Sequence, residues 1–226
     1  MYRERPALLP GAVVWTSTVP AAGATHRVLP DGCLDVIWVD GELLVAGPDT
    51  GAYVTTSAPG TRYIGLRFAP GTGPTILGTP AHLLRDSRVP LAQLWPADRV
   101  RQLADEVAAQ PRTLEVAAVR RWRDAGPSDR AVAVIVARLR AGTPVAVTAQ
   151  AVGLSERQLH RRCLDAFGYG PKTLARVLRL RRALALARAG TPFAAVAATA
   201  GYADQAHLSR EVKALAGVSL TELLTT

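Results

Sequence analysis

The chain has few of the residues that build metal sites, disulfide frameworks and membrane spans. Its 226 residues include 2 cysteines and 4 histidines. The cysteines, Cys33 and Cys163, are expected to remain reduced. No apolar run approaches the roughly 18–20 residues that cross a bilayer, and the first residues lack the apolar core of a signal peptide. These absences predict a cytoplasmic protein without a membrane segment.

Lysine is also scarce: Lys172 and Lys213 are the only 2 among 27 basic residues. This bias, with the abundant alanine, is typical of a GC-rich bacterial genome. The charges are unevenly placed. Residues 128–226 hold 14 Lys and Arg against 6 Asp and Glu, a net charge of +8, whereas residues 1–127 hold 13 against 12, a net charge of +1. The basic second half is therefore the half expected to meet nucleic-acid phosphates.

The second half contains a sequence repeat. Residues 141–144 (Ala-Gly-Thr-Pro) recur 48 positions later as residues 189–192. After the turn that follows, the matched pairs are 49 positions apart: Leu159 and Leu208, Arg161 and Arg210, Gly168 and Gly217. Two copies of one unit, with one residue inserted in the turn, account for these matches.

Each copy is expected to form two helices joined by a tight turn. Thr143 and Thr191 are predicted to be N-cap residues, with the following prolines at the first helical position. The short alanine-rich helix is expected to end at a glycine, Gly153 in the first copy. Ser155 and Asp204 are then expected to cap the second helix of each copy. This arrangement is a helix-turn-helix.

The second helix of each copy is amphipathic. Its apolar positions follow helical spacing and are expected to face the core: Leu159, Cys163 and Ala166, then Leu208, Val212 and Leu215. The opposite faces are polar and are predicted to enter major-groove segments ~34 Å apart. Arginine can donate two hydrogen bonds to guanine, and the arginines on these faces are Arg157, Arg161 and Arg210. The other candidate base contacts are His160, Gln205 for adenine, Ala206 for the thymine methyl group, and Ser209.

Two further features belong to this interpretation. Pro171 to Ala189 is expected to be one long helix that fixes the separation of the two units, and its basic residues are expected to contact phosphates. His207 is expected to turn toward phosphate or the fold interior rather than toward a base.

The repeat resembles the DNA-binding domain of AraC/XylS-type transcription regulators. The first half of that domain is similar to residues 153–161 (Gly-Leu-Ser-Glu-Arg-Gln-Leu-His-Arg) and 167–171 (Phe-Gly-Tyr-Gly-Pro). The second half is similar to residues 201–210 (Gly-Tyr-Ala-Asp-Gln-Ala-His-Leu-Ser-Arg) and Gly217. The resemblance covers about the last 100 residues and departs from the family at residues 218–220 (Val-Ser-Leu), where a Ser-Pro pair is common.

The first half is predicted to be an antiparallel sheet or small barrel over about residues 7–70. Alternating and β-branched stretches predict its strands at 12–19, 34–39, 42–46 and 63–68. Asp40-Gly41 is a two-residue signal for a type I′ hairpin. The helical period then predicts segments at 75–84, 97–109 and 113–122.

Residues 26–35 and 46–50 resemble the β-rich region that precedes this DNA-binding domain in a subset of the family. The resemblance implies a domain that senses a small molecule, forms a homodimer, or does both. No heptad or apolar stripe in the sequence demonstrates the homodimer.

The first half offers no chemistry for an enzyme. Its only histidines, His26 and His82, lie on different predicted elements, and Cys33 is its only cysteine, so neither a histidine-rich metal site nor a cysteine-rich zinc site is expected. No Gly-x-Ser-x-Gly elbow occurs. Asp31 and Asp35 are interpreted as a turn residue and a strand-face carboxylate. We therefore expect no enzyme activity, no cofactor and no metal.

The sequence thus predicts a multidomain α+β protein. A β-rich domain spans residues 1–123, a linker 124–130, and an all-α domain of two helix-turn-helix units 131–226. The predicted function is sequence-specific regulation of transcription on double-stranded DNA. Two alternatives remain: a catalytic or metal-binding β domain that uses DNA binding for targeting, and a nonspecific architectural DNA binder.

Overall fold

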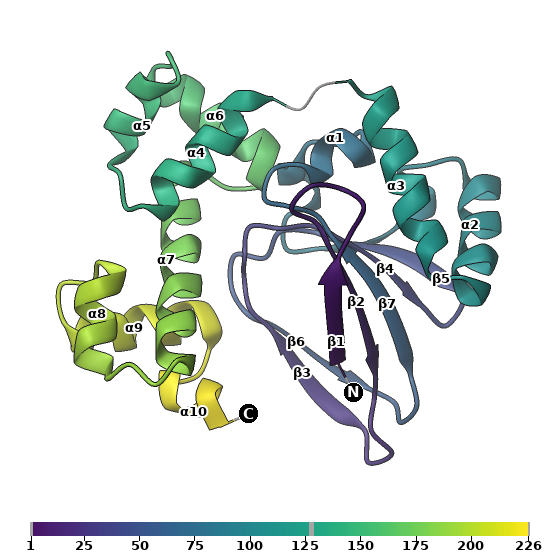
Figure 1. Cartoon of the computed structure of the whole chain (residues 1–226), viewed down its shortest axis with the longest axis horizontal. Coiled ribbons are helices and arrows are strands. Elements are labelled where there is room, and N and C mark those ends of the chain that lie inside the picture. The colour runs from purple at the N-terminus through teal and green to yellow at the C-terminus, as the bar shows by residue number, and fades with distance from the viewer. Residues whose placement is uncertain (1, 127–128, 226) are drawn as a thin grey trace.

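The computed structural model describes residues 2–126 and 129–225, and its two halves have different architectures (Figure 1). The N-terminal half contains all of the strands: β1 (Tyr2–Pro6), β2 (Val13–Thr18), β3 (Ala24–Val28), β4 (Asp35–Val39), β5 (Glu42–Ala46), β6 (Tyr53–Ser57), β7 (Arg62–Arg67) and β8 (Arg88–Pro90). Its helices are α1 (Gly73–Leu77), η1 (Ala81–Leu84), η2 (Leu91–Gln93), α2 (Ala97–Ala109) and α3 (Arg112–Asp124).

The main sheet has six antiparallel strands in the order β1-β2-β7-β4-β5-β8, and β3 pairs with β6 in a separate two-stranded sheet. The predicted hairpin joins β4 to β5. Asp40 and Gly41 have φ values of 50° and 86°, the left-handed conformation that a type I′ turn requires at both positions. The antiparallel sheet predicted from the sequence is therefore confirmed.

Several boundaries differ from the predicted ones. β1, β3, β6 and β8 were not predicted, and β8 carries the main sheet beyond the predicted limit at residue 70. The helical segment expected at 75–84 is two short helices, because α1 ends at Gly78, a C-cap residue with a left-handed φ of 74°, and Pro80 then precedes η1. The predicted linker 124–130 begins at the last residue of α3 and ends at the first residue of α4. Residues 127 and 128 of that linker lie outside the described residues.

The core of the N-terminal half lies between the main sheet and its helices. Strand side chains such as Ile64 and Leu66 are fully buried there, together with Leu77 of α1, Val107 of α2 and Leu114 of α3. Helices α1 to α3 close one end of the sheet, whereas the β3–β6 sheet extends from the other end (Figure 1). Within the part of the chain that the structure describes, no helix has the length and hydropathy to cross a membrane.

The C-terminal half is entirely helical, as predicted. Its helices are α4 (Arg130–Arg140), α5 (Val145–Ala151), α6 (Glu156–Phe167), α7 (Pro171–Arg188), α8 (Phe193–Ala200), α9 (Gln205–Ala216) and α10 (Leu220–Thr225). We call α5–α6 the first unit and α8–α9 the second unit. In Figure 1 the units lie at opposite ends of α7.

Helix α7 contributes buried side chains to the cores of both units. Leu174, Val177 and Leu178 in its first half lie in the core of the first unit. Leu180 and Leu184 in its second half lie in the core of the second unit. The long helix predicted between the copies is therefore confirmed, and it joins the two units through buried side chains rather than as a free spacer.

A glycine in the loop after β5 offers a sharp test of this fold. A Cβ atom added to Gly47 would lie 1.6 Å from the carbonyl oxygen of Leu84, whereas a Cβ at Gly51 would meet nothing closer than 3.8 Å. Gly47→Ala is therefore expected to force backbone apart and to destabilise the N-terminal half by about 3 kcal/mol. Gly51→Ala is the matched control with little expected effect. Thermal unfolding followed by tryptophan fluorescence measures both, since all 4 tryptophans lie in this half.

Candidate nucleic-acid interface

In the first unit, a capping box fixes the start of α6. The Ser155 hydroxyl accepts a hydrogen bond from the backbone N–H of Gln158 at 3.3 Å, and Gln158 Oε1 accepts one from the backbone N–H of Ser155 at 2.8 Å. Two otherwise unpaired N–H groups of the first turn are thereby satisfied. Gly153, in the turn before it, has φ 68°. The cap predicted at Ser155 is confirmed, and it sets the direction in which α6 leaves the turn.

The two faces of α6 are as the spacing predicts. Leu159, Cys163 and Ala166 are buried in the core of the first unit. Burial raises the pKa of the Cys163 thiol to about 12, so this cysteine behaves as a small apolar side chain. The predicted base-reading residues lie on the exposed side: Arg157, His160 and Arg161. Of these, His160 packs closely over Gly170 at the start of α7, while Arg161 also borders a groove of about 970 Å³ beside the N-terminal half.

The second unit repeats this construction. Asp204 caps α9 by accepting a hydrogen bond from the backbone N–H of His207 at 2.6 Å. Leu208, Val212 and Leu215 are buried on the inner face. The predicted reading residues are exposed on the outer face: Gln205, Ala206, Ser209 and Arg210. The two copies therefore present equivalent polar faces on equivalent helices.

Two side chains of α9 also have contacts within the chain. His207 Nδ1 accepts a hydrogen bond from the backbone N–H of Ala203 at 3.3 Å, and its ring lies edge-on to Tyr202 at 5.3 Å. His207 thus turns toward the fold, one of the two orientations predicted for it. The hydroxyl of Ser209 donates to the carbonyl oxygen of Gln205 at 2.9 Å, and it must rotate to meet a base.

The predicted caps at Thr143 and Thr191 are wrong. The N-cap residues of α5 and α8 are Pro144 and Pro192, one position later, and neither has a side-chain cap hydrogen bond. Because proline lacks an N–H, it can occupy this position without leaving a donor unpaired.

The arginines of α7 have surroundings that the sequence did not predict. Arg176 pairs with Glu211 of α9 through Nε at 2.8 Å and Nη2 at 3.1 Å, and this hydrogen bonding lowers the pKa of the glutamate. Arg179 stacks over the ring of Tyr202. Both arginines therefore fasten the second unit to α7. Arg181 and Arg182 line a cavity that faces the N-terminal half, which leaves the exposed Arg188 as a candidate phosphate contact.

The two aspartates of the N-terminal half have the structural roles expected for them. Asp31 Oδ1 accepts from the backbone N–H of Cys33 at 2.9 Å, which shapes the turn before β4. Asp35 Oδ1 accepts from Trp15 Nε1 at 2.6 Å, and Arg67 lies 3.4 Å from both carboxylates. Burial raises the pKa of Asp35, and the positive charge of Arg67 opposes that effect.

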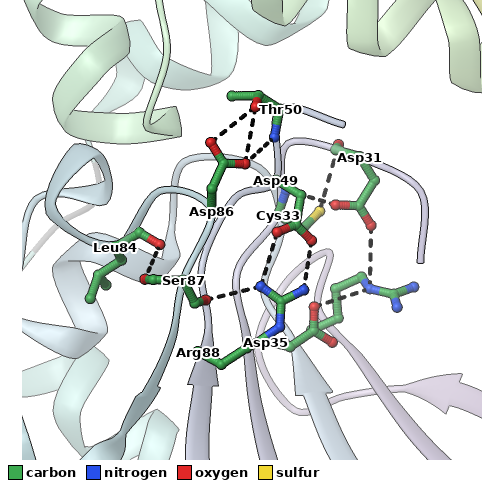
Figure 2. A network of polar contacts seen from close by, with 10 residues as sticks. Asp31, Cys33, Asp35, Asp49, Thr50, Leu84, Asp86, Ser87 and Arg88 are labelled. Atoms are coloured by element: carbon green, nitrogen blue, oxygen red, sulfur yellow. Dashed lines mark hydrogen bonds and ion pairs between the residues drawn. The ribbon is translucent and has the colours of Figure 1, made fainter. Parts of the chain in front are cut away.

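A second polar cluster lies beside this one, as Figure 2 shows. The Arg88 guanidinium donates to both carboxylate oxygens of Asp49 at 2.9 and 2.8 Å, and Asp86 accepts from the backbone N–H of Thr50 at 2.7 Å. These bonds brace the loops after β5 and before β8. Sequence reasoning missed Arg67 and Arg88, because their partners are 32 and 39 residues away.

The loops in Figure 2 lie opposite helices of the C-terminal half. Gly32 packs against Leu174 and Tyr169, and Pro48 packs against Gly168. Among the residues that the structure describes, no group of three or more His, Cys, Asp or Glu is placed to hold a metal ion. The hydrogen bonds of these aspartates lie within the N-terminal half and hold the loops whose Gly32 and Pro48 contact the helical half.

Comparison with known proteins agrees with this geometry. A helix-turn-helix domain model matches residues 148–226, and a domain of unknown function (DUF6597) matches residues 12–90. No curated protein matches the chain.

Solved structures of ToxT from Vibrio cholerae share the fold of the whole chain. One superposes with a TM-score of 0.55 at 10% identity, covering 99% of this chain and 98% of ToxT. An apo ToxT variant gives 0.53 at 11% identity, covering 97% of this chain and 99% of that one. The chain therefore carries an AraC-type helix-turn-helix domain behind a β-rich domain, and the two together have the fold of ToxT.

Proposed function

We propose that the protein regulates transcription by placing α6 and α9 in two adjacent major-groove segments of one duplex. The observation that carries this proposal is the pair of equivalent polar faces, each backed by its own buried core and joined through α7. In this proposal the two helices enter two successive turns of one groove, which are about 34 Å apart. The net charge of +8 on residues 128–226 supports binding to phosphates.

The proposed base contacts are the exposed polar residues of these two helices. Guanine is contacted by guanidinium groups, which match its O6 and N7 atoms: Arg157, Arg161 and Arg210. The remaining proposed contacts are His160, Gln205 with adenine, Ala206 with a thymine methyl group, and Ser209.

Selection of bound sequences from a random DNA pool by the full-length protein, at near-physiological salt, tests this proposal. We expect enrichment of one site with two base-preference blocks about one helical turn apart. A nonspecific architectural binder would instead show no enrichment and a binding constant that falls smoothly as salt rises. Such a result would contradict the proposed function.

We further propose that a small-molecule effector acts between the two halves. A cavity of about 900 Å³ is lined by both, with Val13, Cys33 and Arg67 on one side and Leu178 and Arg182 on the other. A ligand there would contact α7 and the β-rich domain together, and could thereby change the placement of α6 and α9. Native mass spectrometry of the protein purified from bacterial cells tests this. We expect a mass excess that is lost in the double variant Arg181→Glu/Arg182→Glu, and a retained excess would contradict the location.

The remaining proposals concern where and in what form the regulator works. We propose that it works in the bacterial cytoplasm, where transcription takes place. A homodimer through the N-terminal half is proposed from the family resemblance, and sedimentation of the full-length protein with and without DNA tests it. A mass of one chain, 23.9 kDa, without DNA and of one chain plus one duplex with DNA would contradict the homodimer.

A further inference from the structure

The N-terminal half contacts the C-terminal ends of both α6 and α9. Helix α6 ends at its C-cap Gly168, whose carbonyl oxygen accepts a hydrogen bond from Arg85 Nη1 at 3.4 Å. Helix α9 ends at its C-cap Gly217, and the carbonyl oxygen of Ala216 just before it accepts from Arg27 Nη1 at 2.8 Å. The two glycines are equivalent positions of the repeat. One arginine from the β-rich half thus contacts the same end of each DNA-reading helix.

The end of a helix is a favourable place for such a contact. The last four carbonyl groups of a helix have no partner within it, and the helix dipole makes that end negative. A guanidinium group satisfies a carbonyl and complements the dipole at once. The last turn of α6 contains no basic residue of its own, so Arg85 supplies from another part of the chain the charge that this end lacks.

Packing accompanies both arginine contacts. On the first unit, His82 Nδ1 lies 3.2 Å from Asp165 Oδ1, and a Cβ added to Gly168 would lie 2.4 Å from the Pro48 side chain. On the second unit, Leu29 packs against the apolar core. The two units are therefore held on two sides, by α7 and by the N-terminal half.

Attachment through α7 alone would fix the distance between the units better than their orientation. Each unit packs on one side of α7, so slight bending or rocking about that helix would tilt α6 relative to α9. A second attachment point on each unit removes this freedom.

We propose that Arg27 and Arg85 are positioning residues for DNA recognition, which hold α6 and α9 in one relative orientation. The N-terminal half then contributes to DNA recognition itself, because it holds the two base-reading helices in position. This inference rests on the proposed function of α6 and α9 as the two base-reading helices.

The test is the dependence of DNA binding on the spacing between the two base-preference blocks. The full-length protein and its variants are titrated with the selected site and with sites in which the spacer is one base pair shorter or longer. We expect Arg27→Gln to reduce the preference for the selected spacing roughly tenfold, equivalent to about 1.4 kcal/mol. Arg85→Gln is expected to have a smaller effect because its hydrogen bond is longer, and Arg27→Lys is expected to retain the preference.

Arg101→Gln is the matched control for lost charge. Arg101 is exposed on α2. Helix α2 lies on the side of the N-terminal half away from α5 to α9 (Figure 1). An unchanged spacing profile in the Arg27→Gln/Arg85→Gln double variant would overturn the inference. Tighter binding of that variant to every site would also overturn it, since the contacts would then restrain the units from DNA. A wild-type protein with no preference among sites would instead overturn the proposed function itself.

Discussion

Leu208→Asp is expected to unfold the second unit while the N-terminal half stays folded. Leu208 is fully buried in the core formed by α7, α8 and α9. Truncation of a buried leucine costs about 2–5 kcal/mol, and a carboxylate at the same place adds the cost of an unpaired buried charge. The sum exceeds the stability that a small helical unit has available.

Two spectroscopic signals separate the expected result from general unfolding. Far-UV circular dichroism reports mainly the helices and should lose intensity in the variant. Tryptophan fluorescence reports the N-terminal half and should keep its cooperative thermal transition, because the 4 tryptophans lie there. Ser209→Asp is the control, since Ser209 is the adjacent residue on the exposed side of the same helix. A normal helical melting curve for Leu208→Asp would show that the buried face of α9 is assigned incorrectly.

Arg161→Ala and Arg210→Ala are expected to give the largest losses of DNA binding. Each change removes a guanidinium group proposed to bind one guanine, which should cost about 1–3 kcal/mol and relax base preference at one position. Because the residues lie on separate units, their effects should be nearly additive. The double variant should then bind the selected site about 10²–10⁴-fold more weakly than the wild type.

Titration of the selected site and of its single-base variants measures both affinity and base preference. Arg101→Ala is the control for a lost positive charge, and it should weaken binding only slightly and equally at all sequences. If Arg161→Ala leaves affinity and preference unchanged, the first reading face lies elsewhere on α6. A uniform loss at every sequence would make Arg161 a phosphate contact.

The strands that escaped prediction have a common reason. All five residues of β1 are exposed, and β3 and β6 carry mixed polar and apolar residues with little burial. Such strands form because a neighbouring strand supplies hydrogen-bond partners. No buried apolar face marks them in the sequence, even where β-branched residues are frequent, as in β6. β4, β5 and β7 are buried on at least part of one face, and their apolar residues allowed these strands to be predicted from the sequence.

The two exposed polar faces proposed to bind DNA could be predicted from the sequence for a different reason. Helical spacing alone separates the inner residues Leu208 and Val212 from the outer residue Arg210, and the repeat shows that the same separation occurs twice. The caps at Ser155 and Asp204 are local interactions that need only three or four residues. The N-cap at Pro144 differs from the predicted Thr143 by one position, because backbone conformation rather than side-chain preference decided where the helix begins.

The sequence by itself determined the two helix-turn-helix units, the long helix between them and the faces that point outward. Those features depend on contacts between residues close together in the chain. Only the tertiary structure decided that Arg176 and Arg179 support the second unit, and that Arg27 contacts Ala216, 189 residues away. The sequence around an arginine does not indicate which distant carbonyl or carboxylate group the side chain will contact. That choice is made when the β-rich half and the helical half pack together.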